Sequence, residues 1–288
     1  MQRTTASEHL LRRRYRALAR LVPSARQGDP EGIHLTRVAT RRLREALRAV
    51  DAGRPGRKAR GKVRRVTRLL GPVRELDVAL ALLDEIEAAQ GGTPAAGAVL
   101  RTAIARERAA LHRGVHERLR AGAFGSVPRR VLRAAREAAG ASADTAPQAV
   151  GRARRRAARL RSAVENAGGL YLPDRLHDVR IAAKKLRYAC EILDEAGRPM
   201  TRVTARLKRA QDLLGRMHDL EVLILRVRGV QASPLAANGG VAVDLARLVR
   251  RLETECRRLH GRYMRQRPDL EAICAQVATA RASGAGAA

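Results

Sequence analysis

Residues Ile33–Arg44 read IHLTRVATRRLR, and residues Leu176–Arg187 read LHDVRIAAKKLR. Both stretches follow one pattern: an apolar residue, histidine, two further residues, arginine, an apolar residue, alanine, any residue, two basic residues, leucine and arginine. His177 follows His34 at a distance of 143 residues (177 − 34). Two copies of so specific a pattern indicate an internal repeat, in which each copy is one structural unit.

A second pair of motifs supports the repeat. Leu69-Leu70-Gly71 in the first half corresponds to Leu213-Leu214-Gly215 in the second, and each is followed by leucine, an acidic residue and valine. The distance from histidine to glycine is 37 residues (71 − 34) in the first copy and 38 (215 − 177) in the second. Two motifs that recur in order at nearly equal spacing predict a duplicated unit of about 140 residues.

The remainder of the chain predicts an all-α protein. Alanine, leucine, arginine and glutamate dominate, and the alternating β-branched runs of strands are missing. Segments rich in glycine and proline separate the helical stretches, with a weak linker around Gly140–Pro147, and the tail 283–288 is expected to be disordered. Helical periodicity predicts helices over Glu8–Val22, Glu31–Ala52, Arg57–Leu70, Leu76–Ala89, Ala98–Ala121, Pro128–Ala139, Gly151–Ala167, Pro173–Glu195, Thr201–Leu214, Asp219–Val227, Val241–Arg265 and Pro268–Arg281.

The charge of the chain predicts an anionic partner. Its 288 residues include 59 Lys and Arg against 28 Asp and Glu, which gives a formal net charge of +31. Such an excess costs self-repulsion in the compact state and attracts polyanions, namely nucleic acid, an acidic membrane surface or a phosphate polymer. Codon bias in a GC-rich genome explains arginine in place of lysine, but it explains the shortage of carboxylates less well.

Several classes of protein are disfavoured by the sequence. No run approaches the 18 apolar residues of a membrane span, and the N-terminus lacks the apolar stretch of a signal peptide. The three cysteines are odd in number and never closely paired, so a disulfide framework or a zinc site is not expected. We therefore expect a reduced, cytoplasmic protein.

Each histidine begins a basic stripe on its predicted helix. At 100° per residue, a first stripe about 20 Å long contains His34, Arg37, Arg41, Arg44 and Arg48. The second stripe contains His177, Arg180, Lys184 and Arg187, and it is shorter because Glu191 replaces Arg48. Imidazole can donate a hydrogen bond to a phosphate oxygen, although a lone histidine at a helix start more often bonds backbone. Neither histidine has the cysteine or carboxylate neighbours of a metal site.

The helix after each histidine motif adds further basic residues. Arg57, Arg60, Arg64 and Arg68 share one face, and Lys208 is the counterpart of Arg64 in the second half. Like charges at this spacing destabilise a helix by a few tenths of a kcal/mol per pair. An unmixed stripe therefore favours a binding role, and a solvated helix face is the alternative.

At these residues the sequence resembles the CHAD family, the conserved histidine α-helical domain. The family pattern His-Asp-Leu-Arg-Val-Ala-x-Arg-Arg-Leu-Arg is similar to His34–Arg44 and to His177–Arg187, and Leu207–Asp219 resembles a later signature of the second half. The likeness extends from about Arg12 to Arg265. It implies one domain over residues 8–282, made of halves 8–140 and 147–282 that form two pseudo-symmetric four-helix bundles.

The resemblance also implies a function and a set of site residues. CHAD domains bind inorganic polyphosphate, without catalysis or a cofactor, along a basic groove or pore between the bundles, so a role at polyphosphate granules is expected. Two departures affect local hydrogen bonding: Leu35-Thr36 stands in place of Asp-Leu, and Glu75 in place of Asp. Carried over by position, the polyphosphate-binding set is His34, Arg37, Arg41, Arg42, Arg44, Arg48, Arg64, His177, Arg180, Lys184, Lys185, Arg187 and Lys208, of which Arg42 and Lys185 lie about 80° off the stripes.

Other functions remain open at this point. Nonspecific nucleic-acid binding fits the charge, but four tyrosines and one phenylalanine make a poor stacking platform. An enzyme acting on polyphosphate or triphosphate would use carboxylates to hold magnesium. Glu253-Thr254-Glu255 has such a spacing, but it is followed by Cys256-Arg257 in a helical pattern typical of a solvated face. An accessory subunit of a polyphosphate- or triphosphate-processing enzyme is a further alternative.

Overall fold

The computed structural model describes residues 5–50, 52–90, 94–120, 122, 124–140, 145–236 and 239–280. These residues form α-helices and one short 3-10 helix, and no strand occurs among them, which confirms the all-α class. Asp51 of the predicted helix Glu31–Ala52, the predicted helix ends at Ala121 and Arg281, residues 141–144 of the predicted linker and the predicted tail 283–288 lie outside the described residues. The helices are α1 (Ala6–Gln27), α2 (Pro30–Ala49), α3 (Gly53–Leu69), α4 (Gly71–Gln90), α5 (Pro94–Arg120), α6 (Val127–Gly140), α7 (Thr145–Ala167), α8 (Pro173–Glu195), α9 (Thr201–Gln231), η1 (Pro234–Ala236) and α10 (Gly239–Thr279).

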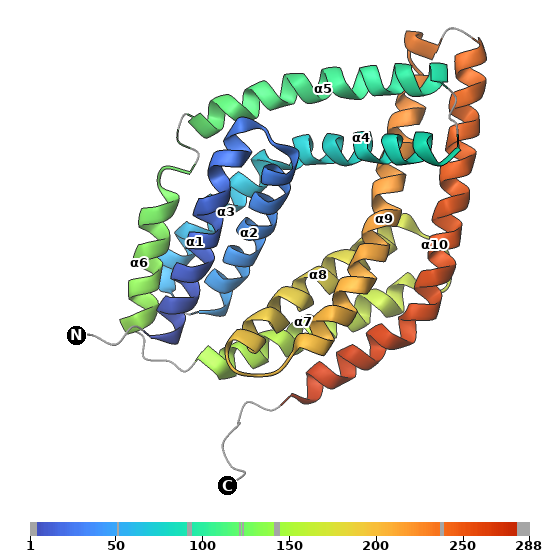
Figure 1. The fold of residues 1–288 in the computed structure, drawn as a ribbon. Coiled ribbons are helices and arrows are strands. Elements are labelled where there is room, and N and C mark those ends of the chain that lie inside the picture. Colours follow the sequence, from blue (N-terminus) through green and yellow to red (C-terminus); the bar gives the residue numbers. More distant parts are fainter. Residues whose placement is uncertain are drawn as a thin grey trace.

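One hydrophobic core lies among α1, α2, α3 and α6, which pack side by side (Figure 1). On α2, the side opposite the basic stripe supplies Leu43, Ala46 and Leu47, all nearly inaccessible to water. Burial of such side chains is the main stabilising contribution in helical proteins, each worth about 1.5–3 kcal/mol when fully buried. The histidine helix of the first half is therefore anchored by its apolar face, which leaves its basic face turned away from this core.

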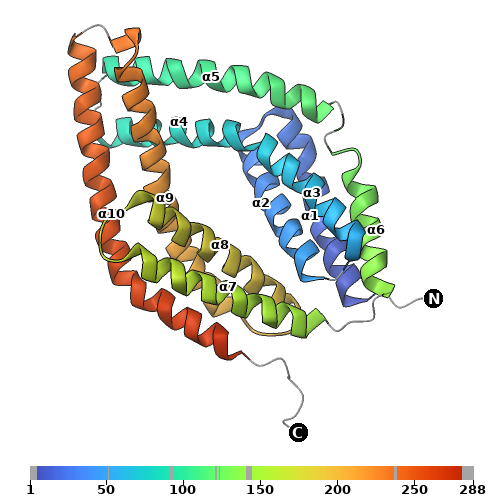
Figure 2. The ribbon, with the colours of Figure 1, turned by 180° about the vertical axis from the view of Figure 1, so that it is seen from behind.

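A second core unites α7, α8, α9 and α10 with α4 and α5 (Figures 1 and 2). Helices α4 and α5 extend from the first helix group to the far ends of α9 and α10, where Arg216 pairs with Glu85 and Arg226 pairs with Glu107. Leu76 and Leu100 belong to this core although they precede the linker in sequence. The boundary between the cores thus differs from the predicted boundary between the repeat halves at residues 140 and 147, which remains a prediction.

Several helices are longer than the sequence predicts. Helix α1 continues through Pro23 to Gln27, so its predicted end at Val22 is wrong. Helix α9 continues through Gly215, so the predicted separation of Thr201–Leu214 from Asp219–Val227 is wrong. Helix α10 continues through Pro268 for 41 residues, so the predicted end at Arg265 is wrong as well. A proline inside a helix costs about 3 kcal/mol. Buried side chains on both sides of Gly215 and Pro268 offset that cost, for example Leu214 with Met217 in α9 and Tyr263 with Leu270 in α10.

The two cores meet where α7 and α8 contact α2, and where Arg14 of α1 pairs with Glu195 of α8. Arg42 on α2 donates from Nε to Glu191 on α8 at 2.9 Å, and Arg156 on α7 lies 3.5 Å from Glu45 on α2. The two helices that carry the histidine motifs therefore lie opposite each other across this junction (Figure 1). None of the described helices has the length and apolar character needed to cross a membrane.

Candidate functional site

Helices α2 and α8 bring the basic residues of the two histidine motifs together. Burial, and then repulsion from Arg41, Arg74 and Arg180, lowers the pKa of Arg37 to about 10, and Glu75 opposes the shift. Because Arg180 of α8 repels the charged form of Arg37 of α2, the two basic stripes lie close to each other. We define the central cluster by its members, which are His34, Arg37, Arg41, Arg74, His177, Arg180, Lys184 and His218.

Lys184 is the most buried cation of the central cluster. The residue is 8% exposed, and burial together with Arg41, Arg180 and Arg37 lowers the pKa of its ammonium to about 6. Asp219 on α9 is the carboxylate that opposes this shift, and burial raises its own pKa. The cluster thus holds more positive charge than its carboxylates balance, and an anion placed among these side chains would lower the electrostatic cost.

The two halves differ in how they support their histidines. His177 Nδ1 lies 3.3 Å from His218 Nδ1, so the two rings form a hydrogen bond in which one Nδ1 donates to the other. Burial, then Arg180 and His177, lowers the pKa of His218 to about 4. In the first half Arg74 occupies the repeat position of His218, three residues after the glycine. Burial and Arg74 both lower the pKa of His34.

Each motif glycine lies beside the motif arginine of its own repeat, and the approach is tight only at Gly71. A Cβ atom placed on Gly71 would lie 3.2 Å from Arg37 Nη1, and one placed on Gly215 would lie 3.8 Å from Arg180 Nε. Arg37 Nη1 also donates to the carbonyl oxygen of Thr67 at 2.7 Å. In both repeats the motif glycine is therefore a neighbour of the arginine that follows the histidine by three residues.

Some predicted site residues are held by carboxylates of the junction. Arg42 and Arg187 both pair with Glu191, at 2.9 Å each, and Arg187 Nε also donates to Gln211 at 3.0 Å. Arg44 is different, because its Nε is buried and has no hydrogen-bond partner. Its pKa is lowered by burial and then by Arg48, with Arg64 and Arg41 as further cationic neighbours. Arg44 therefore extends the central cluster toward Arg64.

Three further predicted residues lie outside the central cluster. Lys185 neighbours Arg156 and Arg48, which together with burial lower its pKa, whereas Lys184 neighbours the central arginines. Arg48 pairs with Glu45 on its own helix. Lys208 is exposed, and its Nζ lies 2.6 Å from an Asp212 oxygen.

The sequence-based site omits Arg74, His218 and Asp219, which the structure places at or beside the central cluster. The signal that could have found Arg74 and His218 is the repeat itself, since both stand three residues after a motif glycine. Asp219 is the next residue, at the position where the first half has Glu75.

Other titratable residues have structural partners. His116 Nδ1 lies 2.7 Å from the carbonyl oxygen of Arg26, which fixes Nδ1 as the protonated nitrogen. The three cysteines are buried and free. Within the part of the chain that the structure describes, no three or more histidine, cysteine, aspartate or glutamate side chains gather as metal ligands would.

Comparisons with known proteins agree with this fold. The chain is similar to the crystal structure of the CHAD domain from the plant Ricinus communis, with 23% identity and a TM-score of 0.66 over 96% of this chain and 92% of that one. It is also similar to PptA from Streptomyces chartreusis, with 20% identity and a TM-score of 0.63 over 94% of this chain and 97% of that one. No curated protein matches it. The CHAD domain pattern matches residues 9–228 of the sequence, and the chain therefore belongs to the CHAD domain family.

Proposed function

We propose that this protein binds inorganic polyphosphate, without turning it over, at the central cluster between α2 and α8. The observation that carries the proposal is the convergence of Arg37 and Arg41 with Arg180 and Lys184 from the other repeat, with fewer carboxylates than cations nearby. A ligand that neutralises this charge must be anionic and must reach both helices at once.

Repeated arginines favour a phosphate polymer in particular. Guanidinium groups bind phosphate oxygens through two parallel hydrogen bonds and stay charged at cellular pH. The pseudo-symmetry of the two helix groups is part of the proposal, because related cations on α2 and α8 would contact successive phosphates of one chain. Arg44 and Arg64 would continue the path along the first helix group.

Nucleic acid is the second candidate, because the net charge of +31 attracts any polyanion. The aromatic residues argue against it, since single-strand binders stack bases on exposed rings. Phe124, Tyr188 and Tyr263 are buried, and Tyr15 and Tyr171 are only partly accessible. Competition decides between the two: duplex DNA or RNA at equal phosphate concentration should fail to displace long-chain polyphosphate, and efficient displacement would refute the proposal.

The acidic pair Glu253 and Glu255, the candidate magnesium ligands of an enzyme, is consistent with binding without catalysis. Glu253 pairs with Arg228 and Glu255 pairs with Arg258 on the surface of α10, so this motif is engaged in ion pairs. We propose that the protein acts in the cytoplasm, at polyphosphate granules, or as an accessory subunit of an enzyme that processes polyphosphate or triphosphate. Release of phosphate from polyphosphate with magnesium, abolished by replacing carboxylates, would contradict the binding-only role.

Calorimetric titration with long-chain polyphosphate tests the site. The variant Arg37→Gln/Arg180→Gln should bind about 100-fold more weakly or worse, because each side chain supplies charge-assisted hydrogen bonds worth about 1.5–3 kcal/mol. Arg161→Gln/Arg250→Gln loses the same charge from exposed positions and should bind like the wild type. Equal affinity in both variants would reject the central cluster as the binding site.

A further inference from the structure

A second concentration of positive charge lies outside the central cluster, on α7. Residues 152–161 read RARRRAARLR and contain no carboxylate. Arg156 is 9% exposed although it is charged, and Arg152 Nε is buried without a hydrogen-bond partner. Arg156 pairs with Glu45, and Arg152 donates from Nη2 to the carbonyl oxygen of Arg48, so these charges are only partly balanced. Partly balanced buried cations are costly, and an anionic ligand would reduce that cost.

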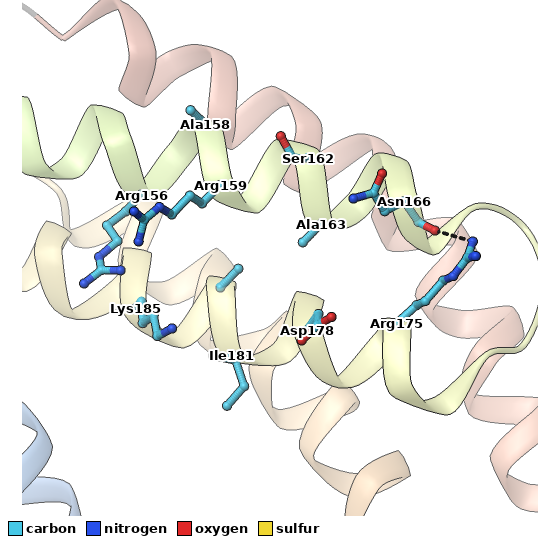
Figure 3. Close-up of a pocket in the computed structure, with 11 residues that line it drawn as sticks. Arg156, Ala158, Arg159, Ser162, Ala163, Asn166, Arg175, Asp178, Ile181 and Lys185 are labelled. Atoms are coloured by element: carbon cyan, nitrogen blue, oxygen red, sulfur yellow. Dashed lines mark hydrogen bonds between the residues drawn. The ribbon is translucent and has the colours of Figure 1, made fainter. Parts of the chain in front are cut away.

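Arg156 and Arg159 of this stretch border a groove between α7 and α8 with a volume of about 430 Å³. Figure 3 shows Arg156 and Arg159 of α7 converging with Lys185 of α8 at one end of it. Arg175 and Asp178 lie at the other end, where Arg175 donates to the carbonyl oxygen of Asn166 at 2.8 Å. The groove therefore has one strongly basic end and one end that contains a carboxylate.

The basic end has a single carboxylate to balance it. Glu45 pairs with Arg48 and also lies 3.5 Å from Arg156. Lys185 is close enough for Arg156, Arg48 and Arg159 to lower its pKa together with burial, and Glu45 is the group that opposes them. One carboxylate is thus shared among several cations.

The corresponding junction of the first half is balanced differently. Arg14 on α1 lies against α8 much as Arg156 on α7 lies against α2, but Arg14 pairs with Glu195 and lies 3.8 Å from Glu191. On the α1 side Glu191 and Glu195 are shared among Arg13, Arg14, Arg42 and Arg187, whereas on the α7 side Glu45 alone faces Arg48, Arg156 and Lys185. Both junctions hold more cations than carboxylates, and the excess per carboxylate is larger at the groove.

We propose that the basic end of the α7–α8 groove, formed by Arg156, Arg159 and Lys185, is a second oxyanion site that takes a compact phosphate group. The ligand is inorganic pyrophosphate or a segment of a polyphosphate chain, both of which present the same phosphoryl oxygens. Two guanidinium forks and one ammonium on neighbouring helices can bind those oxygens from two sides.

The groove gives the site a boundary and a location of its own. Ala163, Ile181 and Ala182 form part of its wall, and apolar neighbours strengthen charge–charge interactions at the basic end. At the far end Arg175 stands beside Asp178, so the charge there is balanced, and a small anion is favoured at the end that holds Arg156, Arg159 and Lys185. The two sites are distinct although Lys184 and Lys185 are adjacent in sequence: Lys184 lies among the central arginines, and Lys185 lines the groove.

Pyrophosphate titration tests the groove independently of the central cluster. In the Arg37→Gln/Arg180→Gln background, the further changes Arg159→Gln and Lys185→Gln should weaken pyrophosphate binding about tenfold or more. The control adds Arg161→Gln and Arg250→Gln to the same background, which removes equal charge from exposed positions outside the groove. Equal pyrophosphate affinity in the two sets would overturn the proposal.

Labelling of lysine amines gives a second readout, because the sequence contains only Lys58, Lys62, Lys184, Lys185 and Lys208. Pyrophosphate should protect Lys185 from acetylation and leave exposed Lys208 reactive, as resolved by fragment-ion mass spectrometry. Unprotected Lys185 at saturating pyrophosphate would overturn the proposal. This readout does not depend on polyphosphate binding at the central cluster, so the two proposals can fail separately.

Long-chain polyphosphate distinguishes the source of the phosphate group. If Arg159→Gln/Lys185→Gln in the otherwise wild-type chain also weakens long-chain binding, the groove takes a segment of the polymer. If only pyrophosphate binding falls, the groove takes a free compact anion. Either result, together with protection of Lys185, supports the second site.

Discussion

At the scale of single residues, Lys184 should couple stability to pH. Its pKa falls from 10.5 to about 6 on folding, so between these values the unfolded chain holds more protons and stability increases as pH rises. Below about pH 6 the folded lysine is also protonated, so the stability gained at higher pH is absent. Lys184→Met removes the cost of burying an ionisable amine, so the ligand-free variant should unfold several degrees higher at neutral pH.

Thermal unfolding monitored by circular dichroism measures this effect. The variant should also show a flatter dependence of unfolding temperature on pH between about 6 and 10. Lys208→Met is the matched control, since Lys208 is exposed and paired with Asp212. A Lys184→Met variant that is less stable than the wild type at neutral pH would contradict the assignment.

Polyphosphate binding should take up protons. A nearby polyanion raises the pKa of Lys184 and of the His177–His218 pair, because opposite charge favours the protonated form. Affinity should therefore fall as pH rises from 6 to 8. Calorimetry in buffers of different ionisation enthalpy measures the uptake directly, and a binding enthalpy that does not change with the buffer would disprove it.

The two motif glycines should respond differently to alanine. Gly215 lies in the interior of α9 with room for a Cβ atom, so Gly215→Ala should stabilise the protein by up to about 1 kcal/mol and leave polyphosphate affinity unchanged. Gly71→Ala places its Cβ against Arg37 Nη1 and should weaken polyphosphate binding severalfold. Urea unfolding and calorimetry of both variants test the pair, and equal effects would show that the closer contact is unimportant.

At the scale of helices, Glu191 fastens α8 to the first helix group. It pairs with Arg42 from α2 and Arg187 from its own helix, and it is largely shielded from water. Glu191→Gln should cost about 1–3 kcal/mol, because the arginines lose a charged partner and repel one another. Glu255→Gln breaks a pair with the exposed Arg258 and should cost much less, because solvent screens such pairs. Equal losses in urea unfolding would show that the junction does not depend on Glu191.

The helices also show which sequence signals are reliable. Proline and glycine predict breaks from local backbone preference alone, and at Gly215 and Pro268 that prediction is wrong. Local preference amounts to about 1–3 kcal/mol, whereas a long helix that packs on several partners buries many apolar side chains. Helices α9 and α10 run through both the α7–α8 part and the α4–α5 part of one core, so a break would separate the two parts.

At the scale of the whole molecule, salt should act in opposite directions on stability and binding. A net charge of +31 repels itself in the folded state, so higher ionic strength should raise the unfolding temperature of the ligand-free protein. Polyphosphate affinity should instead fall steeply with salt, since binding a polyanion through several phosphates releases counterions. Unfolding scans and titrations across one salt series test both trends, and an affinity that is insensitive to salt would contradict phosphate binding.

The sequence alone determined the all-α class, the repeat and the basic stripes of α2 and α8, because helical periodicity, motif spacing and charge are local properties of the chain. It also identified Arg37, Arg41, Arg180 and Lys184, which the structure brings together.

Only the tertiary structure decided which cations share a site. Lys184 and Lys185 are neighbours in sequence, yet the packing of α2, α7 and α8 places one in the central cluster and the other in a groove. It also paired Arg42 with Glu191 across the junction and joined α4 and α5 to the core of the second half. The physical reason is that Coulomb interactions and apolar burial depend on distances between helices, which no periodicity along one helix contains.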